Sequence, residues 1–229
     1  FSHIYKVYKI IRDAEITLEA NPDDLTSEYI SMLRTFPFNR ISMGIQTFQD
    51  STLKLLQRRH TAEQAIRAFQ NCRTAGFRNI SIDLMYGLPG ETLASWKEDL
   101  KQALALHPEH ISAYHLIYEE GTTLWQLREQ HKLEEADEDL SVSLFGTLID
   151  SLTAAGYEHY EISNFCLPGF HSRHNSSYWT EKKYLGCGPS AHSYNGTSRQ
   201  WNVASLNEYI RGISNGNPTF EVEELDLYT

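Results

Sequence analysis

The segment Asn79-Ile-Ser-Ile-Asp-Leu-Met-Tyr-Gly-Leu-Pro-Gly-Glu-Thr92 carries the clearest fold signal in the chain. Ile80, Ile82 and Leu84 alternate with polar residues, which is the period-2 pattern of a β-strand. A Gly-Leu-Pro-Gly turn and a helical pattern follow. A carboxylate late in such a strand is costly to bury without partners. Parallel α/β folds bind ligands at that end of their strands, so Asp83 is a candidate site residue.

The same strand–turn–helix order recurs on both sides of this segment. Besides the strand at Ile80, the pattern predicts strands over residues 15–19, 40–46, 110–118 and 157–162. Helical patterns separate them, and one begins with the capping box Thr61-Ala-Glu-Gln64. Strands that alternate with helices imply a parallel sheet with right-handed crossovers. We therefore predict an α/β fold, an open or partial (β/α) barrel.

The composition changes after residue 162, where Ser, Asn, Gly, His and Tyr replace the periodic patterns. This change predicts a barrel part over residues 1–162 and a loop-rich, irregular extension over residues 163–229. The chain opens at Phe1 in a helix-like run without a cap. We expect an internal piece of a longer protein, truncated at its N-terminus and followed by a further C-terminal domain.

Charge and composition exclude several classes of partner. A net charge of −10 argues against a nucleic-acid surface or an anionic membrane partner. No apolar run approaches the ~20 residues needed to span a bilayer. Three scattered cysteines, Cys72, Cys166 and Cys187, do not form a disulfide framework, which favours a reducing, cytoplasmic location.

Several polar residues should meet at one edge of a parallel sheet. Glu19, Gln46, Asp83 and His115 stand near strand ends, and Arg58 follows at a helix end. A carboxylate suits an ammonium group, a guanidinium suits a carboxylate, and Asp or Gln suits ribose hydroxyls. The set therefore complements a small zwitterion. The alternatives are structural: a surface ion pair for the arginine and a loop cap for the aspartate.

Four motifs, in order, resemble the oxygen-independent coproporphyrinogen III oxidase group of radical SAM proteins. They are Leu18-Glu-Ala-Asn-Pro22, Arg40-Ile-Ser-Met-Gly-Ile-Gln-Thr-Phe48, Asp83-Leu-Met-Tyr-Gly-Leu-Pro-Gly90 and Tyr184-Leu-Gly-Cys-Gly-Pro-Ser-Ala-His-Ser193. Within that group, His174-Asn-Ser-Ser-Tyr-Trp179 is similar to the signature of the haem chaperone branch, the HemW-like proteins. The resemblance covers nearly the whole chain.

The resemblance implies a role for each site residue. Glu19 would meet the amino group of S-adenosylmethionine (SAM) and Arg58 its carboxylate. Gln46 and Asp83 would hold the ribose hydroxyls, and Ile117 would lie beside the adenine.

The resemblance also implies a haem site. His174 would be an axial ligand to haem iron, since imidazole is a common one, and Tyr178 and Trp179 would stack on the porphyrin. From the residues alone, the preferred interpretation of His174 and Asn175 is a loop pair that bonds backbone groups, and Tyr178 and Trp179 could simply pin the loop.

One departure from the family is plain. The resemblance implies a [4Fe–4S] cluster held by a Cys-x3-Cys-x2-Cys run, and this chain has no such run. The cluster ligands are thus expected upstream of Phe1, and the chain alone should not generate a radical.

Three functions follow. The first is haem binding and delivery to an acceptor protein. The second is oxidative decarboxylation of coproporphyrinogen III in porphyrin biosynthesis, and the third is a non-catalytic structural remnant.

Overall fold

The computed structural model describes residues 1–225 and divides them into two compact units. The first unit is Phe1–Ser172, and the second begins at Arg173. The sequence predicted this boundary at residue 162, ten residues before the end of the first unit at Ser172. The observed boundary is later because the chain adds the strand at residues 164–166 to the first sheet before it leaves that unit. Residues 226–229 of the predicted extension lie outside the described residues.

The first unit is built on a six-stranded sheet with the order β1-β2-β3-β4-β6-β5. Its strands are β1 Thr17–Ala20, β2 Arg40–Gln46, β3 Ile80–Tyr86, β4 His110–His115, β5 Glu158–Glu161 and β6 Asn164–Cys166. Its helices are α1 Ser2–Val7, the 3₁₀ turn η1 Pro22–Asp24, α2 Ser27–Leu33, α3 Asp50–Leu55, α4 Ala62–Thr74, α5 Leu93–Ala105, α6 Thr123–Glu129 and α7 Glu138–Ala154.

Strands β1 to β4 pair in parallel, which confirms the predicted α/β fold with a parallel sheet. The sequence predicted five strands, and the structure adds a sixth to this sheet. The short strand β6 lies between β4 and β5 and runs antiparallel to both. Its three residues, Asn-Phe-Cys, are too few to show an alternation in the sequence.

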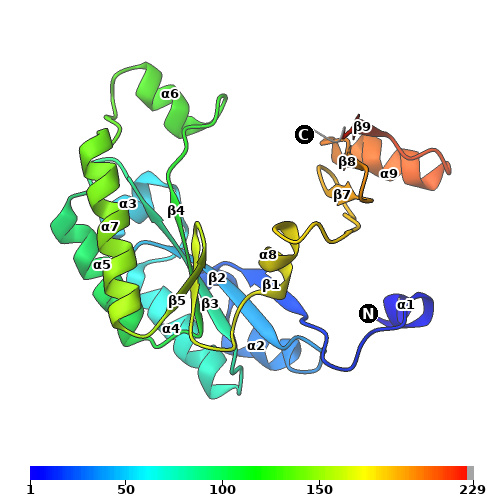
Figure 1. Ribbon diagram of the computed structural model, residues 1–229, viewed down its shortest axis with the longest axis horizontal. Coiled ribbons are helices and arrows are strands. Elements are labelled where there is room, and N and C mark those ends of the chain that lie inside the picture. The colour runs from blue at the N-terminus through cyan, green and yellow to red at the C-terminus, as the bar shows by residue number, and fades with distance from the viewer. Residues whose placement is uncertain (226–229) are drawn as a thin grey trace. The chain divides into compact units, whose positions relative to one another are not determined.

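The two faces of this sheet differ in chemistry because side chains alternate along each strand. Ile41, Met43 and Ile45 of β2 are fully buried on one face, together with Ile82 of β3 and Ile111 of β4. Helices α4, α5 and α7 lie along that face (Figure 1) and complete the core. Polar residues occupy the other face.

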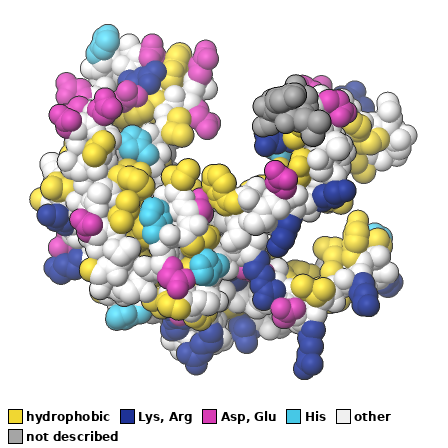
Figure 2. Space-filling view, in the orientation of Figure 1, with side chains coloured by type: hydrophobic (Ala, Val, Ile, Leu, Met, Phe, Trp, Pro, Cys, Tyr) yellow, Lys and Arg dark blue, Asp and Glu magenta, His cyan; other side chains and the backbone are white. Residues whose placement is uncertain are grey.

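The segment between β4 and α7 is acidic and solvated, as the sequence indicates. It contains six acidic residues, two more follow at the start of α7, and most of its side chains are exposed. Figure 2 shows them gathered over α6. Arg128 of α6 pairs with Glu129 at 2.9 Å and with Glu135 at 2.8 Å. The pair with Glu135 links the helix α6 to the connector that follows it.

The second unit contains more regular structure than the irregular extension predicted from the sequence. Its elements are α8 Arg173–Tyr178, β7 His192–Tyr194, β8 Ser198–Asn202, α9 Leu206–Ser214 and β9 Phe220–Glu224. The three strands form an antiparallel sheet in the order β7-β8-β9. Their polar sequences lack the apolar alternation from which strands are predicted. No helix among the described residues is long and apolar enough to cross a bilayer.

Candidate functional site

The polar face of the main sheet brings the predicted acids together. Glu19 of β1 lies opposite Ser42 of β2, and Asp83 of β3 lies opposite Gly44. Ser42 and Gly44 are two residues apart, so their partners share one face. The Ser42 hydroxyl donates to Asp83 Oδ1 at 3.2 Å. The geometric expectation that Glu19 and Asp83 occupy one face of the sheet is met.

The carboxyl group of Asp83 titrates close to neutral pH. Burial raises its pKa to about 6, while hydrogen bonds from the hydroxyls of Ser42 and Ser112 oppose the rise. The charge of Arg40 also opposes it, and the charge of Glu19 adds to it. Above that pKa the group is an acceptor-only carboxylate, the form that receives hydrogen bonds from sugar hydroxyls.

Gly44 leaves the space in which two further predicted residues meet. A Cβ atom at this position would lie 2.9 Å from Gln46 Nε2 and 3.3 Å from Arg58 Nη2. Arg58 Nη2 donates to the carbonyl oxygen of Gly44 at 3.1 Å and to Asn21 Oδ1 at 2.6 Å. The cradle over Gly44 therefore holds an amide and a guanidinium next to Asp83, which fits a ligand with a carboxylate and hydroxyl groups.

A bulge in β2 aims Gln46 into this cradle. The register of β2 against β3 shifts between Gly44 and Gln46, and Gln46 has a φ of 71°. Non-glycine residues adopt such angles rarely, and they are concentrated at ligand sites. Sequence reasoning found Gln46 and Arg58 but missed Asn21, whose signal is the Asn-Pro step after β1.

Two predicted residues lie elsewhere. His115 ends β4 at the expected edge, but its ring packs edge-on against Tyr86 at 5.1 Å on the helix-covered face. Asp83 pairs with Ser112, so the odd-numbered residues of β4 belong to the opposite face. The strand ends at His115, so Ile117 does not lie on β4 as predicted and is 76% exposed. Its contact with adenine stays a prediction.

Buried polar residues on the same face were missed by the sequence analysis. His110 Nδ1 lies 2.8 Å from the hydroxyl of Ser81, and its Nε2 lies 2.7 Å from the hydroxyl of Tyr160. Burial lowers the pKa of His110 to about 3, so the ring is neutral. Arg40 is also buried, and its Nε has no hydrogen-bond partner among the described residues. The alternation of polar or small with apolar residues in Arg40-Ile-Ser-Met-Gly44 could have indicated that Arg40 lies on the polar face.

The turn after β3 is closed by a carboxyl group. Glu91 Oε2 accepts from the backbone N–H of Gly87 at 2.6 Å and from that of Leu88 at 3.3 Å. Burial nevertheless raises the pKa of Glu91 from an ordinary 4.5 to about 7. The folded chain therefore keeps a proton on Glu91 at pH values where the unfolded chain releases it.

This proton makes stability depend on pH. Between about pH 4.5 and pH 7 the folded state binds more protons at Glu91 than the unfolded state, so its contribution to the free energy of unfolding falls as pH rises, by at most about 3 kcal/mol. Urea denaturation at pH 5 and pH 8 measures the fall. Glu91→Gln keeps the acceptor oxygen and should lose this part of the pH dependence. An identical pH dependence in the variant contradicts the assignment.

The residues expected to bind haem lie on and beside helix α8. His174 Nε2 is 3.1 Å from the hydroxyl of Tyr178, one helical turn later, and the two rings meet edge-on at 5.1 Å. The Tyr178 ring continues to Tyr184, with centroids 5.0 Å apart. Trp179 is 62% exposed. The spacing His-x3-Tyr thus places an imidazole and a phenol on one helix face.

The three cysteines do not fit an iron–sulfur cluster. Cys72 and Cys166 are buried at separate places in the first unit, and Cys187 is exposed in the second. The sulfur of Cys166 lies within 4.8 Å of ligand atoms of Glu158 and His171. Burial raises the pKa of its thiol to about 11, and the other two residues already pair with each other at 3.2 Å.

Comparison with known proteins finds similarities over most of the chain. Residues 1–103 match the model of the radical SAM superfamily. The heme chaperone HemW of Bacillus subtilis is 39% identical over 197 residues, which are 86% of this chain and 52% of that protein. HemW of Escherichia coli is 38% identical over 180 residues, 79% of this chain and 47% of that protein. The chain spans about half the length of these relatives.

The solved structures support the same fold. Coproporphyrinogen III oxidase (HemN) from Escherichia coli, described as a radical SAM enzyme, matches with a TM-score of 0.81. The match covers 98% of this chain and 55% of that one at 24% identity, so it bears on the fold alone. The radical SAM superfamily, whose model matches residues 1–103, uses SAM and a [4Fe–4S] cluster as cofactors. The cradle over Gly44 suits SAM, whereas the described cysteines do not suit the cluster.

Proposed function

We propose that the protein containing this chain binds haem and delivers it to an acceptor protein in the cytoplasm. The observation that carries the proposal is the helix α8, where His174 and Tyr178 stand one turn apart in a sequence similar to that of HemW-like proteins. The relatives named heme chaperone at 36–40% identity support it. Imidazole is a common axial ligand of haem iron, so His174 is the proposed ligand and Tyr178 and Trp179 the flanking aromatic residues.

We propose that the polar face of the main sheet binds SAM. Glu19 takes the amino group, Arg58 the carboxylate, and Gln46 and Asp83 the ribose hydroxyls. The shared face of the two acids and the cradle over Gly44 support this assignment. Ile117 is the proposed adenine contact. No radical step is assigned to this chain, because its described cysteines do not form a cluster site.

Titration with haemin tests the haem-binding role. The chain should develop a Soret band that saturates with added haemin. His174→Ala should shift that band and weaken binding by about tenfold, which corresponds to about 1.4 kcal/mol. His131→Ala, at an exposed histidine of the first unit, is the matched control and should bind as the unaltered chain does.

The possible outcomes test separately whether the chain binds haem and whether His174 is the iron ligand. No saturable Soret band contradicts haem binding by this chain. A band that is unchanged in position and affinity in His174→Ala removes this histidine from the iron while leaving haem binding in place.

A further inference from the structure

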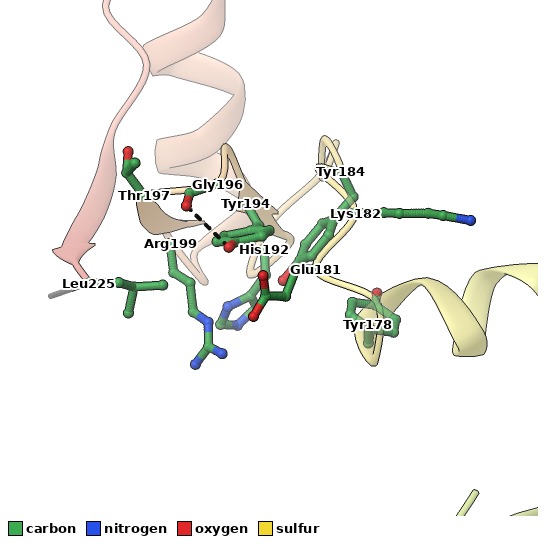
Figure 3. Close-up of a pocket in the computed structure, with 10 residues that line it drawn as sticks. All are labelled: Tyr178, Glu181, Lys182, Tyr184, His192, Tyr194, Gly196, Thr197, Arg199 and Leu225. Carbon is green, nitrogen blue, oxygen red and sulfur yellow. Dashed lines mark hydrogen bonds between the residues drawn. The ribbon is translucent and has the colours of Figure 1, made fainter. Parts of the chain in front are cut away.

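The second unit contains a pocket that, apart from Tyr178, is lined by residues with no role proposed above. It has a volume of about 620 Å³, within the range of about 300–1,000 Å³ usual for small-molecule sites. All of its walls come from the second unit, and Figure 3 shows the side chains. The lining residues are Tyr178, Glu181, Lys182, Tyr184, His192, Tyr194, Gly196, Thr197, Arg199 and Leu225.

The register of the small sheet places three of these side chains on one face. Tyr194 pairs with Arg199 across β7 and β8, and His192 pairs with Trp201. Paired residues share a face, as do residues two apart on a strand. His192, Tyr194 and Arg199 therefore project to the same side, where Figure 3 shows the imidazole next to the arginine side chain.

Aromatic rings form one wall of the pocket. Tyr184 and Tyr194 exchange two backbone hydrogen bonds, of 3.0 and 2.9 Å, and their ring centroids are 6.1 Å apart. Tyr178 adds a third ring, 5.0 Å from Tyr184. Such a wall offers broad, rigid apolar surface to a flat ligand, at a low entropy cost per residue.

Cationic side chains form the polar part of the pocket wall. Within residues 1–225, neither Arg199 nor Lys182 has an ion-pair partner within 4.0 Å. Glu181 also lines the pocket, and Glu223 of β9 lies opposite Arg199 in the register without closing an ion pair. A guanidinium without a partner beside aromatic rings is suited to a carboxylate carried by a planar molecule, because it can bind the carboxylate with two hydrogen bonds.

We propose that this pocket binds the carboxylate-bearing edge of a tetrapyrrole, with Arg199 taking a carboxylate and the tyrosine rings packing on the macrocycle. The proposal rests on the haem-binding function above and extends it, because it gives the second unit a recognition site for the propionate groups that is separate from the residue proposed to bind iron.

The test compares two probes and three variants of the whole chain. Haemin carries free carboxylates, and haemin dimethyl ester has the same ring and iron with both carboxylates blocked. Arg199→Ala should weaken haemin binding by tenfold or more and leave ester binding unchanged. Arg199→Lys, which keeps the charge but loses the two-pronged geometry, should fall between. Arg211→Ala, at an exposed arginine of α9 outside the pocket, is the control and should match the unaltered chain.

Each result decides something. If haemin binds the unaltered chain and Arg199→Ala equally well, the pocket proposal is overturned while haem binding stands. If Arg199→Ala weakens haemin and ester alike, carboxylate recognition is overturned. If the unaltered chain binds no haemin, both the proposed function and the pocket fail. Far-ultraviolet circular dichroism identifies a misfolded alanine variant, in which case Arg199→Lys decides.

Discussion

Replacing Trp96 with alanine is expected to lower the free energy of unfolding of the first unit by about 3–5 kcal/mol. Trp96 is fully buried between α5, β3 and α7. Its ring lies 5.7 Å from that of Tyr86, and its indole N–H donates to the carbonyl oxygen of Leu144 at 3.0 Å. Alanine removes the ring, leaves a cavity in a close-packed core and leaves that carbonyl without its indole donor.

Urea denaturation followed by circular dichroism measures this loss. Trp96→Phe keeps most of the volume but lacks the N–H, so its loss should be smaller, at about 1–2 kcal/mol. Trp179→Ala, at a tryptophan that is 62% exposed, should change stability by about 0.5 kcal/mol or less. Equal effects of the buried and exposed replacements would contradict the packing described for α5 and α7.

Replacing Asp99 with alanine is expected to lower the free energy of unfolding by about 3 kcal/mol. Asp99 of α5 is buried and accepts three hydrogen bonds from the segment after β2. They come from the hydroxyl of Thr47 at 2.5 Å, the backbone N–H of Phe48 at 3.2 Å and Gln49 Nε2 at 3.0 Å. Alanine leaves these donors, two of which belong to the buried residues Thr47 and Phe48, without their carboxylate acceptor.

The neighbouring residue provides the control for Asp99. Glu98 is exposed and pairs only with Lys101 on the helix surface, so Glu98→Ala should cost about 0.5 kcal/mol or less. Hydrogen exchange at residues 46–49 gives a local measurement, since Asp99→Ala should speed it and Glu98→Ala should not. Unchanged exchange in Asp99→Ala would show that another contact holds the segment that follows Gln46.

The strands of the first unit could be predicted because their signal is local. A strand shows itself within a few residues, either by alternation of apolar and polar residues or by a short apolar run. A capping box such as that at Thr61 marks the start of a helix in the same local way. Asp83, in the middle of β3, was recognisable for the same reason: one carboxylate interrupts an apolar pattern. The three-residue strands β6 and β7 were missed because such short segments contain no period.

The candidate site could be predicted only as a list of residues. Glu19 and Asp83 share a face through the register of three strands, and register is a property of the sheet. His115 was predicted at the site but lies on the opposite face of the sheet from Asp83. Neighbouring residues of a strand point to opposite faces, so the face of His115 depends on the register of β4. The pocket around Arg199 gave no signal, since its walls come from residues spread over the second unit.

The sequence by itself determined the α/β class, the parallel direction of the first four strands and the types of side chain available for binding. Periodicity and turn chemistry act over a few residues, so the order of residues alone specifies them. The tertiary structure decided which polar side chains meet, because the cradle over Gly44 depends on a bulge in β2 and on an arginine that arrives from beyond α3. Contacts between distant segments follow from packing, and no short stretch of sequence encodes them.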